Sequence, residues 1–222
     1  MLRVFTHFIL ELVEIMLQKI HPENPSPRQI SAVVEVLQKD GIIVYPTDTL
    51  YALGCDMKST RAIERLCRLI GKKPEEANLS LICHDLSNLS EYTVPFDNRI
   101  YKMMRKCFPG PYTFILKANH RVPKLFKNKK KTIGIRVPDN NIPRQIVELL
   151  GNPIVTASLR DITTHEENLT NPELIYEMYE KHVDLVIDGG DGELEPSTVI
   201  DCSNDEIVLV RQGKGETDFL SL

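Results

Sequence analysis

The chain has 222 residues, of which 42% are hydrophobic and 26% are charged, and its formal net charge is −4. This composition is typical of a soluble globular protein and excludes a low-complexity or disordered chain. The length suits one large domain or two small ones. Because no linker rich in proline, glycine or serine divides the chain and no internal repeat is visible, we expect a single domain over 16–222.

The N-terminal stretch 2–17 is apolar, but four ionisable side chains interrupt it. A membrane span needs about 20 mostly uncharged residues, so this stretch is not one, and no small-residue cleavage site follows it. Two interpretations stay open. The stretch is an additional amphipathic helix, or residues 1–15 are an extension upstream of a natural start at Met16, which is the interpretation that we favour.

The helices and strands interleave along the chain, and the spacing of apolar residues predicts where they lie. Helices are expected at 27–40, 59–70, 98–108, 143–150 and from 172 onward. Strands are expected at 41–45, 50–55, 79–83, 112–117, 132–137, 153–157, 184–187, 198–201 and 207–210. Because the strands cluster toward the C-terminus, the layout is mixed α/β rather than a pure βαβ repetition.

The corner at 46–51 joins the first two predicted strands. Pro46 ends the first strand, because proline cannot donate a hydrogen bond to a sheet ladder. Four polar side chains follow it closely: Thr47, Asp48, Thr49 and Tyr51. A loop held by rigid strands favours a binding site, whereas the same residue types also form simple tight turns. Local chemistry leaves both interpretations open.

Charge is strongly segregated along the chain. Twelve basic residues and no acid lie between Asp97 and Asp139, whereas 160–222 holds sixteen acids and four lysines or arginines. Such segregation favours an anion site or an RNA surface over a merely solvated face. The RNA-binding candidates are the lysines of one polar loop: Lys124, Lys127, Lys129, Lys130 and Lys131.

The five cysteines are odd in number, lie far apart and form no C-x-x-C pair. This spacing favours neither a zinc site nor a disulfide framework, so we expect a reducing, cytoplasmic compartment and no tightly bound metal. A cysteine nucleophile would need a base that the sequence does not place. Buried cysteines that act as small hydrophobic residues are therefore expected.

The standard phosphate-binding motifs are missing, since the chain has neither a P-loop nor a G-x-G-x-x-G after a strand. Side-chain cations would then have to neutralise a nucleotide. Arg136, in an otherwise apolar strand, is the best candidate, and Arg211 is similar; a structural salt bridge is the alternative. Hydroxyls recur at strand ends: Thr47, Thr49, Thr113, Ser158, Ser197 and Thr198. Together these groups suit a small zwitterion or phosphate ligand, with chemistry by positioning rather than through a covalent intermediate.

Four segments together resemble the YrdC-like family, which includes the threonylcarbamoyl-AMP synthases. They are P-T-D-T-L-Y-A-L-G-C at 46–55, P-G-P-Y-T at 109–113, I-G-I-R-V-P at 133–138 and S-T-V-I-D at 197–201. The resemblance implies a twisted, mostly parallel α/β sheet with flanking helices around a basic cavity. It also implies synthesis of threonylcarbamoyl-AMP from ATP with Mg²⁺, L-threonine and bicarbonate for tRNA modification. Members of the family have been linked to double-stranded RNA binding as well.

The resemblance also implies site residues, although it assigns no catalytic residue. Around the threonine it places Thr47, Thr49, Tyr51, His84, Arg136 and Ser197. Around the nucleotide it places Lys72, Lys73, Thr113, Ser158 and Arg211.

Two departures from the synthase pattern fall on the nucleotide side. The synthases carry K-G-R-P where this chain has G-K-K-P at 71–74, and S-A-N where it has S-L-R at 158–160. Both changes resemble the YciO-type branch of the family. Three hypotheses therefore stay open: a synthase, a non-catalytic paralogue that binds double-stranded RNA or tRNA, and an enzyme that acts on an adenylylated substrate.

Overall fold

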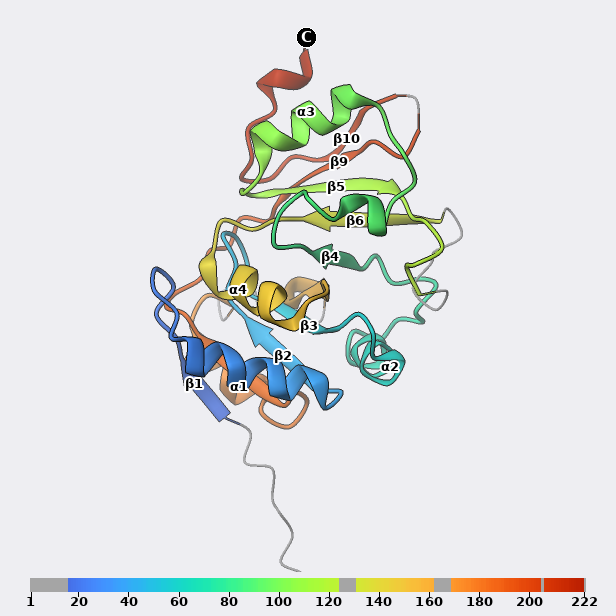
Figure 1. Ribbon diagram of the computed structural model, residues 1–222. Helices are drawn as coiled ribbons and strands as arrows, with labels where there is room; N and C mark the ends of the chain where they lie inside the picture. The colour runs from blue at the N-terminus through green and yellow to red at the C-terminus, as the bar shows by residue number, and fades with distance from the viewer. Residues whose placement is uncertain (1–15, 124–130, 162–168, 205, 222) are drawn as a thin grey trace, which may run out of the picture.

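A computed structural model of the chain describes residues 16–123, 131–161, 169–204 and 206–221 (Figure 1). Its helices are α1 Pro27–Gln38, α2 Thr60–Leu69, α3 Asn98–Cys107, α4 Asn141–Leu150 and α5 Pro172–Tyr179. Its strands are β1 Met16–Lys19, β2 Ile42–Tyr45, β3 Ala52–Asp56, β4 Ser80–Ile82, β5 Tyr112–Lys117, β6 Thr132–Arg136, β7 Ile154–Ser158, β8 Leu185–Asp188, β9 Thr198–Asp201 and β10 Val208–Arg211. The five predicted helices and nine predicted strands are confirmed, with small shifts at their ends.

One sheet contains these ten strands, in the order β1-β8-β2-β3-β7-β4-β6-β5-β9-β10. The sheet twists strongly, since β5 and β6 run across the view in Figure 1 while β2 runs obliquely. The expectation of a mostly parallel sheet is wrong for the described residues. The parallel pairs are β1–β8, β2–β8, β4–β6 and β5–β9. The antiparallel pairs are β2–β3, β3–β7, β4–β7, β5–β6 and β9–β10. Pairing between consecutive strands, as at the 46–51 corner, has to be antiparallel when the connection is this short.

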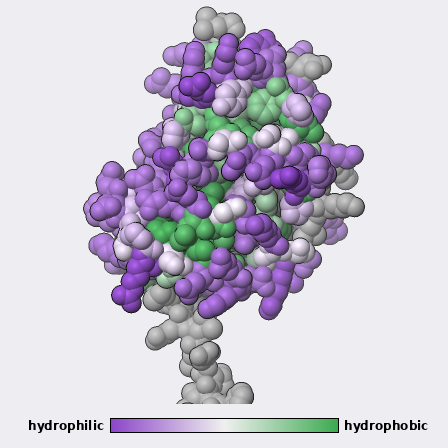
Figure 2. Space-filling view, in the orientation of Figure 1, coloured by the Kyte–Doolittle hydropathy of each residue, from purple (hydrophilic) through white to green (hydrophobic). Residues whose placement is uncertain are grey.

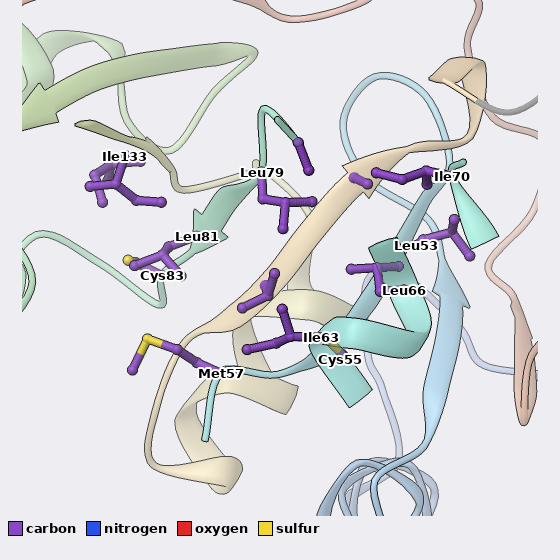
Figure 3. Packing of buried hydrophobic residues seen from close by; sticks show 14 of the residues in the cluster. Leu53, Cys55, Met57, Ile63, Leu66, Ile70, Leu79, Leu81, Cys83 and Ile133 are labelled. Atoms are coloured by element: carbon purple, nitrogen blue, oxygen red, sulfur yellow. The ribbon is translucent and has the colours of Figure 1, made fainter. Parts of the chain in front are cut away.

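Two hydrophobic clusters cover opposite faces of the sheet. Side chains of α1 and α4 pack with Ile43, Tyr45 and Ile82, and apolar surface is visible between these helices in Figure 2. Side chains of α2, α3 and α5 pack with the alternate residues of the same strands, such as Val44 and Leu81. Figure 3 shows the part of this second cluster formed around α2. The alternation follows from strand geometry, in which successive side chains point to opposite faces.

Side-chain caps fix where four of these helices begin. The hydroxyl of Ser59 accepts a hydrogen bond from the Ala62 amide at the start of α2. Asp97, Asn140 and Asn171 cap α3, α4 and α5 in the same way. Each such cap satisfies an amide that has no partner within the helix, and it contributes about 0.5–2 kcal/mol. None of the described helices is long and apolar enough to cross a bilayer.

The α1 and α4 side of the sheet also carries a strip of small and polar residues, here called the polar face: Ser80, Thr113, Gly134, Thr156 and Ser158. The register pairs Ser80 with both Gly134 and Thr156, so these residues share one side of the sheet. A Cβ at Gly134 would lie 2.2 Å from the Ser80 Oγ, so only glycine fits there. Ser80 and Ser158 are half-buried although their strands are internal, so solvent reaches the polar face.

The N-terminal expectations have two outcomes. Residues 1–15 lie outside the described residues, so neither interpretation of that stretch is tested. The next residues, Met16–Lys19, form β1 and pair in parallel with β8. This strand was not expected, because its four residues carry no clear apolar alternation of their own and only the pairing with β8 defines them.

Candidate functional site

The centre of the candidate site is Arg136, the last residue of β6, which is only 9% exposed. Its Nη2 donates hydrogen bonds to Thr49 Oγ1 at 2.6 Å, Asp48 Oδ1 at 2.6 Å and Thr47 Oγ1 at 3.1 Å. Its Nε is buried and has no hydrogen-bond partner in the part of the chain that the structure describes. Buried donors are nearly always paired, so this unpaired nitrogen marks Arg136 as a candidate for binding a ligand acceptor.

The 46–51 corner is held rigidly against Arg136. Thr47 Oγ1 donates to the Leu50 carbonyl at 2.7 Å and accepts from the Thr49 amide at 3.1 Å. Asp48 Oδ2 accepts from the Asp139 amide at 3.1 Å, which ties the corner to the segment after β6. The corner is therefore more than a tight turn, because it presents two hydroxyls and a carboxylate to a buried cation.

A line of polar groups continues from Arg136 across the neighbouring strands. Phe114 pairs with Ile135, so Thr113 and Arg136 come next on β5 and β6. Thr113 Oγ1 lies 2.9 Å from the Ser197 hydroxyl. Arg211, at the end of β10, donates through Nη2 to the Ser197 carbonyl at 2.9 Å. The structure thus brings Thr47, Thr49, Thr113, Arg136, Ser197 and Arg211 together at one end of the polar face.

Ser158 lies at the other end of the polar face. Arg136 pairs with Ile82, and Ile82 with Ile154, so Ser158 lies four residues along β7, about 13 Å from that row at ~3.3 Å per residue. There it pairs with Ala52, the residue after the 46–51 corner. Lys72 and Lys73 follow α2, whose last turn packs near that end of β7 but in the cluster on the opposite face of the sheet (Figure 3).

Two predicted threonine ligands, Tyr51 and His84, have described partners other than Arg136. Tyr51 is fully buried, and its hydroxyl donates to the Gly190 carbonyl at 2.6 Å and accepts from the Gly189 amide at 3.1 Å. Burial raises the pKa of this phenol, so Tyr51 is a neutral support for the turn at 189–190. The His84 Nδ1 lies 3.2 Å from the Arg144 carbonyl of α4, beside a cavity of about 190 Å³. The described contacts place neither side chain against Arg136.

Sequence reasoning gave no binding role to two residues of the site, Asp48 and Lys214. Asp48 belongs to a recognised motif, but its ion partner is 88 residues away and no local signal connects them. Lys214 Nζ donates to the Asp48 carbonyl at 3.1 Å and to Glu193 Oε1 at 2.6 Å. Residues 160–222 are mostly acidic, so Lys214 did not stand out as a candidate. Its two hydrogen bonds link the 46–51 corner to the C-terminal segment.

The remaining predicted binding residues divide into two groups. Four lysines of the predicted RNA-binding loop lie outside the described residues: Lys124, Lys127, Lys129 and Lys130. The fifth, Lys131, is exposed just before β6.

The five cysteines are all buried, as expected. Burial raises the pKa of Cys67 and Cys107 to about 11 and that of Cys83 to about 12, which keeps these thiols protonated and unreactive at neutral pH.

Comparison with known proteins identifies a family and similar folds. A family model for Sua5, YciO and YrdC, described as "Telomere recombination", matches residues 35–213. YciO of Escherichia coli is 46% identical over 198 residues, which are 89% of this chain and 95% of that protein. The crystal structure of E. coli YciO has a TM-score of 0.84 at 43% identity and covers 92% of this chain and 98% of its own.

More distant relatives carry an activity or a ligand in their names. A threonylcarbamoyl-AMP synthase of Photorhabdus laumondii is 29% identical over 197 residues, 86% of this chain and 99% of that protein. The crystal structure of P. abyssi Sua5 complexed with L-threonine shares the fold, with a TM-score of 0.78 at 21% identity over 89% of this chain and 57% of that one. The family model, together with the identity to YciO over most of the chain, shows that this protein belongs to the Sua5/YciO/YrdC family.

Proposed function

We propose that this protein is an enzyme of the threonylcarbamoyl-AMP synthase type, which binds L-threonine at Arg136 and ATP along the polar face. The observation that carries the proposal is the buried Arg136, whose Nε has no partner in the described chain. A buried guanidinium with a vacant donor suits a ligand carboxylate. The names of two relatives support the same assignment, since one is a threonylcarbamoyl-AMP synthase and another was solved with L-threonine.

The two ends of the polar face would then divide the substrates. The threonine carboxylate would bind Arg136, with the hydroxyls of Thr47 and Thr49 beside it. Phosphates of ATP would be neutralised by Arg211 near Thr113 and by Lys72 and Lys73 beyond Ser158, with Mg²⁺ arriving as part of the nucleotide complex. The threonine amine and bicarbonate would form a carbamate with loss of water, and a carbamate oxygen would displace pyrophosphate from the α-phosphorus.

The test is incubation with ATP, Mg²⁺, L-threonine and bicarbonate, followed by assay of pyrophosphate and threonylcarbamoyl-AMP. We expect pyrophosphate release that requires both threonine and bicarbonate. Lys73 stands where the synthases have arginine and lacks the bidentate fork, so we expect a raised KM for ATP. A folded protein that binds ATP and threonine but releases no pyrophosphate would contradict the proposed reaction.

RNA binding is the second candidate, and the exposed side of α3 favours it. Arg99, Lys102, Arg105 and Lys106 are exposed opposite the buried stripe of this helix. Four cations within two helical turns form a surface that fits a phosphate backbone.

The RNA test compares two triple variants that lose the same charge. Lys102→Ala/Arg105→Ala/Lys106→Ala removes cations of α3, and Lys39→Ala/Lys58→Ala/Lys181→Ala removes exposed lysines elsewhere. We expect tRNA affinity to fall steeply with salt and to weaken only in the α3 variant. Equal losses in both variants would exclude α3 as the RNA surface.

A further inference from the structure

Asp48 is the one anion among the described side chains that contact Arg136, and half of its acceptor positions have no described partner. Its Oδ1 accepts from Arg136 Nη2 at 2.6 Å, and its Oδ2 accepts from the Asp139 amide at 3.1 Å. The two side chains are only 8% and 10% exposed. An ionised carboxylate has about four acceptor positions, and these two bonds occupy half of them.

The charge balance of the pair restricts which ligand can bind. Arg136 alone would suit any small anion, but Arg136 with Asp48 is already neutral. A plain carboxylate or phosphate that bound the vacant Nε would put two anions around one buried cation, and a like charge in a buried site is costly. A zwitterion brings one charge of each sign and leaves the site neutral.

The arrangement of the two side chains matches the two charges of an α-amino acid. The ammonium nitrogen of such a ligand is two bonds from its carboxyl carbon. A carboxylate on the Nε side of Arg136 therefore brings its ammonium beside the carboxylate that occupies Nη2 of the same guanidinium. Building on the proposed function, we propose that Asp48 binds the α-ammonium of the substrate and selects a zwitterionic amino acid over a simple carboxylate or phosphate.

The experiment is isothermal titration with L-threonine and with 3-hydroxybutyrate, which has the same carbon skeleton and hydroxyl but no amine. For the unmodified protein we expect threonine to bind at least about tenfold more tightly. Asp48→Asn keeps the size of the side chain and its acceptor toward Arg136 but removes the charge. It should bring the ratio of the two affinities close to one, by weakening threonine and not 3-hydroxybutyrate.

The matched control is Glu193→Gln, which removes the same charge at the same corner. Glu193 contacts Lys214 and its amide donates to the Thr49 carbonyl, but Arg136 is not among its described partners. The control should keep the preference for threonine.

Three results would overturn the inference. Asp48→Asn could retain the preference, or it could weaken both ligands equally, which is the behaviour of a residue that only supports the corner. The unmodified protein could bind both ligands equally, a result that needs no variant to fold. If the folded, unmodified protein bound neither ligand, the proposed threonine site itself would fail, and this outcome differs from the other three.

Discussion

The two ends of the polar face are built on opposite principles. At one end a single arginine is buried, and three side chains of a rigid corner contact it through one nitrogen. At the other end Ser158 is half-buried at the end of its strand, and the candidate phosphate ligand Lys73 is exposed in the loop that follows α2. The first end can select a ligand by geometry, whereas the second can select it mainly by charge.

Burial decides how much each end contributes. Removing one partner of a buried ion pair costs about 3–5 kcal/mol, whereas exposed charges contribute about 0–1 kcal/mol and are screened by salt. Amino-acid binding should therefore depend steeply on single atoms at Arg136. Nucleotide binding should depend weakly on any one lysine and strongly on ionic strength.

The largest effect is expected from Arg136→Lys. Lysine keeps the charge but loses the planar fork, so threonine affinity should fall by about 100-fold or more, as measured by titration. Arg65→Lys is the matched control. Arg65 makes a two-bond contact with Asp184 away from the polar face, at 2.7 and 3.1 Å, so its loss should lower stability and leave threonine affinity unchanged. Equal threonine affinity in Arg136→Lys and Arg65→Lys would contradict the claim that the geometry of Arg136 selects the amino acid.

A smaller effect is expected from Thr49→Val, which removes the hydroxyl 2.6 Å from Arg136 Nη2 and little volume. Loss of one hydrogen bond to a charged group costs about 1.5–3 kcal/mol, so threonine affinity should fall by roughly tenfold or more. Thr93→Val removes another buried hydroxyl, which donates to the Leu89 carbonyl in the helical turn after β4. It should lower the melting temperature without changing threonine affinity, and a loss of affinity in this control would mean that both variants act through the fold.

Lys72→Ala/Lys73→Ala should have a still smaller effect. ATP affinity should fall by a few-fold at low salt, and the difference should shrink as salt rises, because the charge of the exposed Lys73 is screened within about 10 Å at 0.1 M. Measuring ATP affinity at several salt concentrations tests this. A loss of ATP affinity that is large and independent of salt would show that these lysines bind the nucleotide in a buried, fixed geometry, as Arg136 is expected to bind threonine.

The sequence was sufficient where the signal was local. Helical periodicity located the five α-helices of the described residues, and Pro46 correctly ended β2. Arg136 stood out because a charge in an apolar strand needs a partner. The partner itself could not be predicted, since Asp48 meets Arg136 only after the corner folds back over the sheet.

The directions of two other candidate side chains could not be predicted either. The Tyr51 hydroxyl reaches the turn at 189–190, and the His84 ring contacts the Arg144 carbonyl of α4, on the same side of the sheet as the polar face. The binding roles given to these two residues stay predictions. Motif resemblance names positions in the chain, whereas the direction of a side chain depends on the packing of elements far away.

Tyr51→Phe should have the smallest effect on threonine and ATP binding, and it tests whether a residue of the corner can support the fold without binding a ligand. The hydroxyl makes two hydrogen bonds to the turn at 189–190, so its removal should lower the free energy of unfolding by about 1–3 kcal/mol, measured by urea denaturation. Threonine and ATP affinities should stay unchanged, because phenylalanine fills the same space and Tyr51 touches neither arginine among its described contacts. A large fall in threonine affinity with unchanged stability would instead make Tyr51 a threonine ligand, as the family resemblance implied. The threonine site would then include the turn at 189–190.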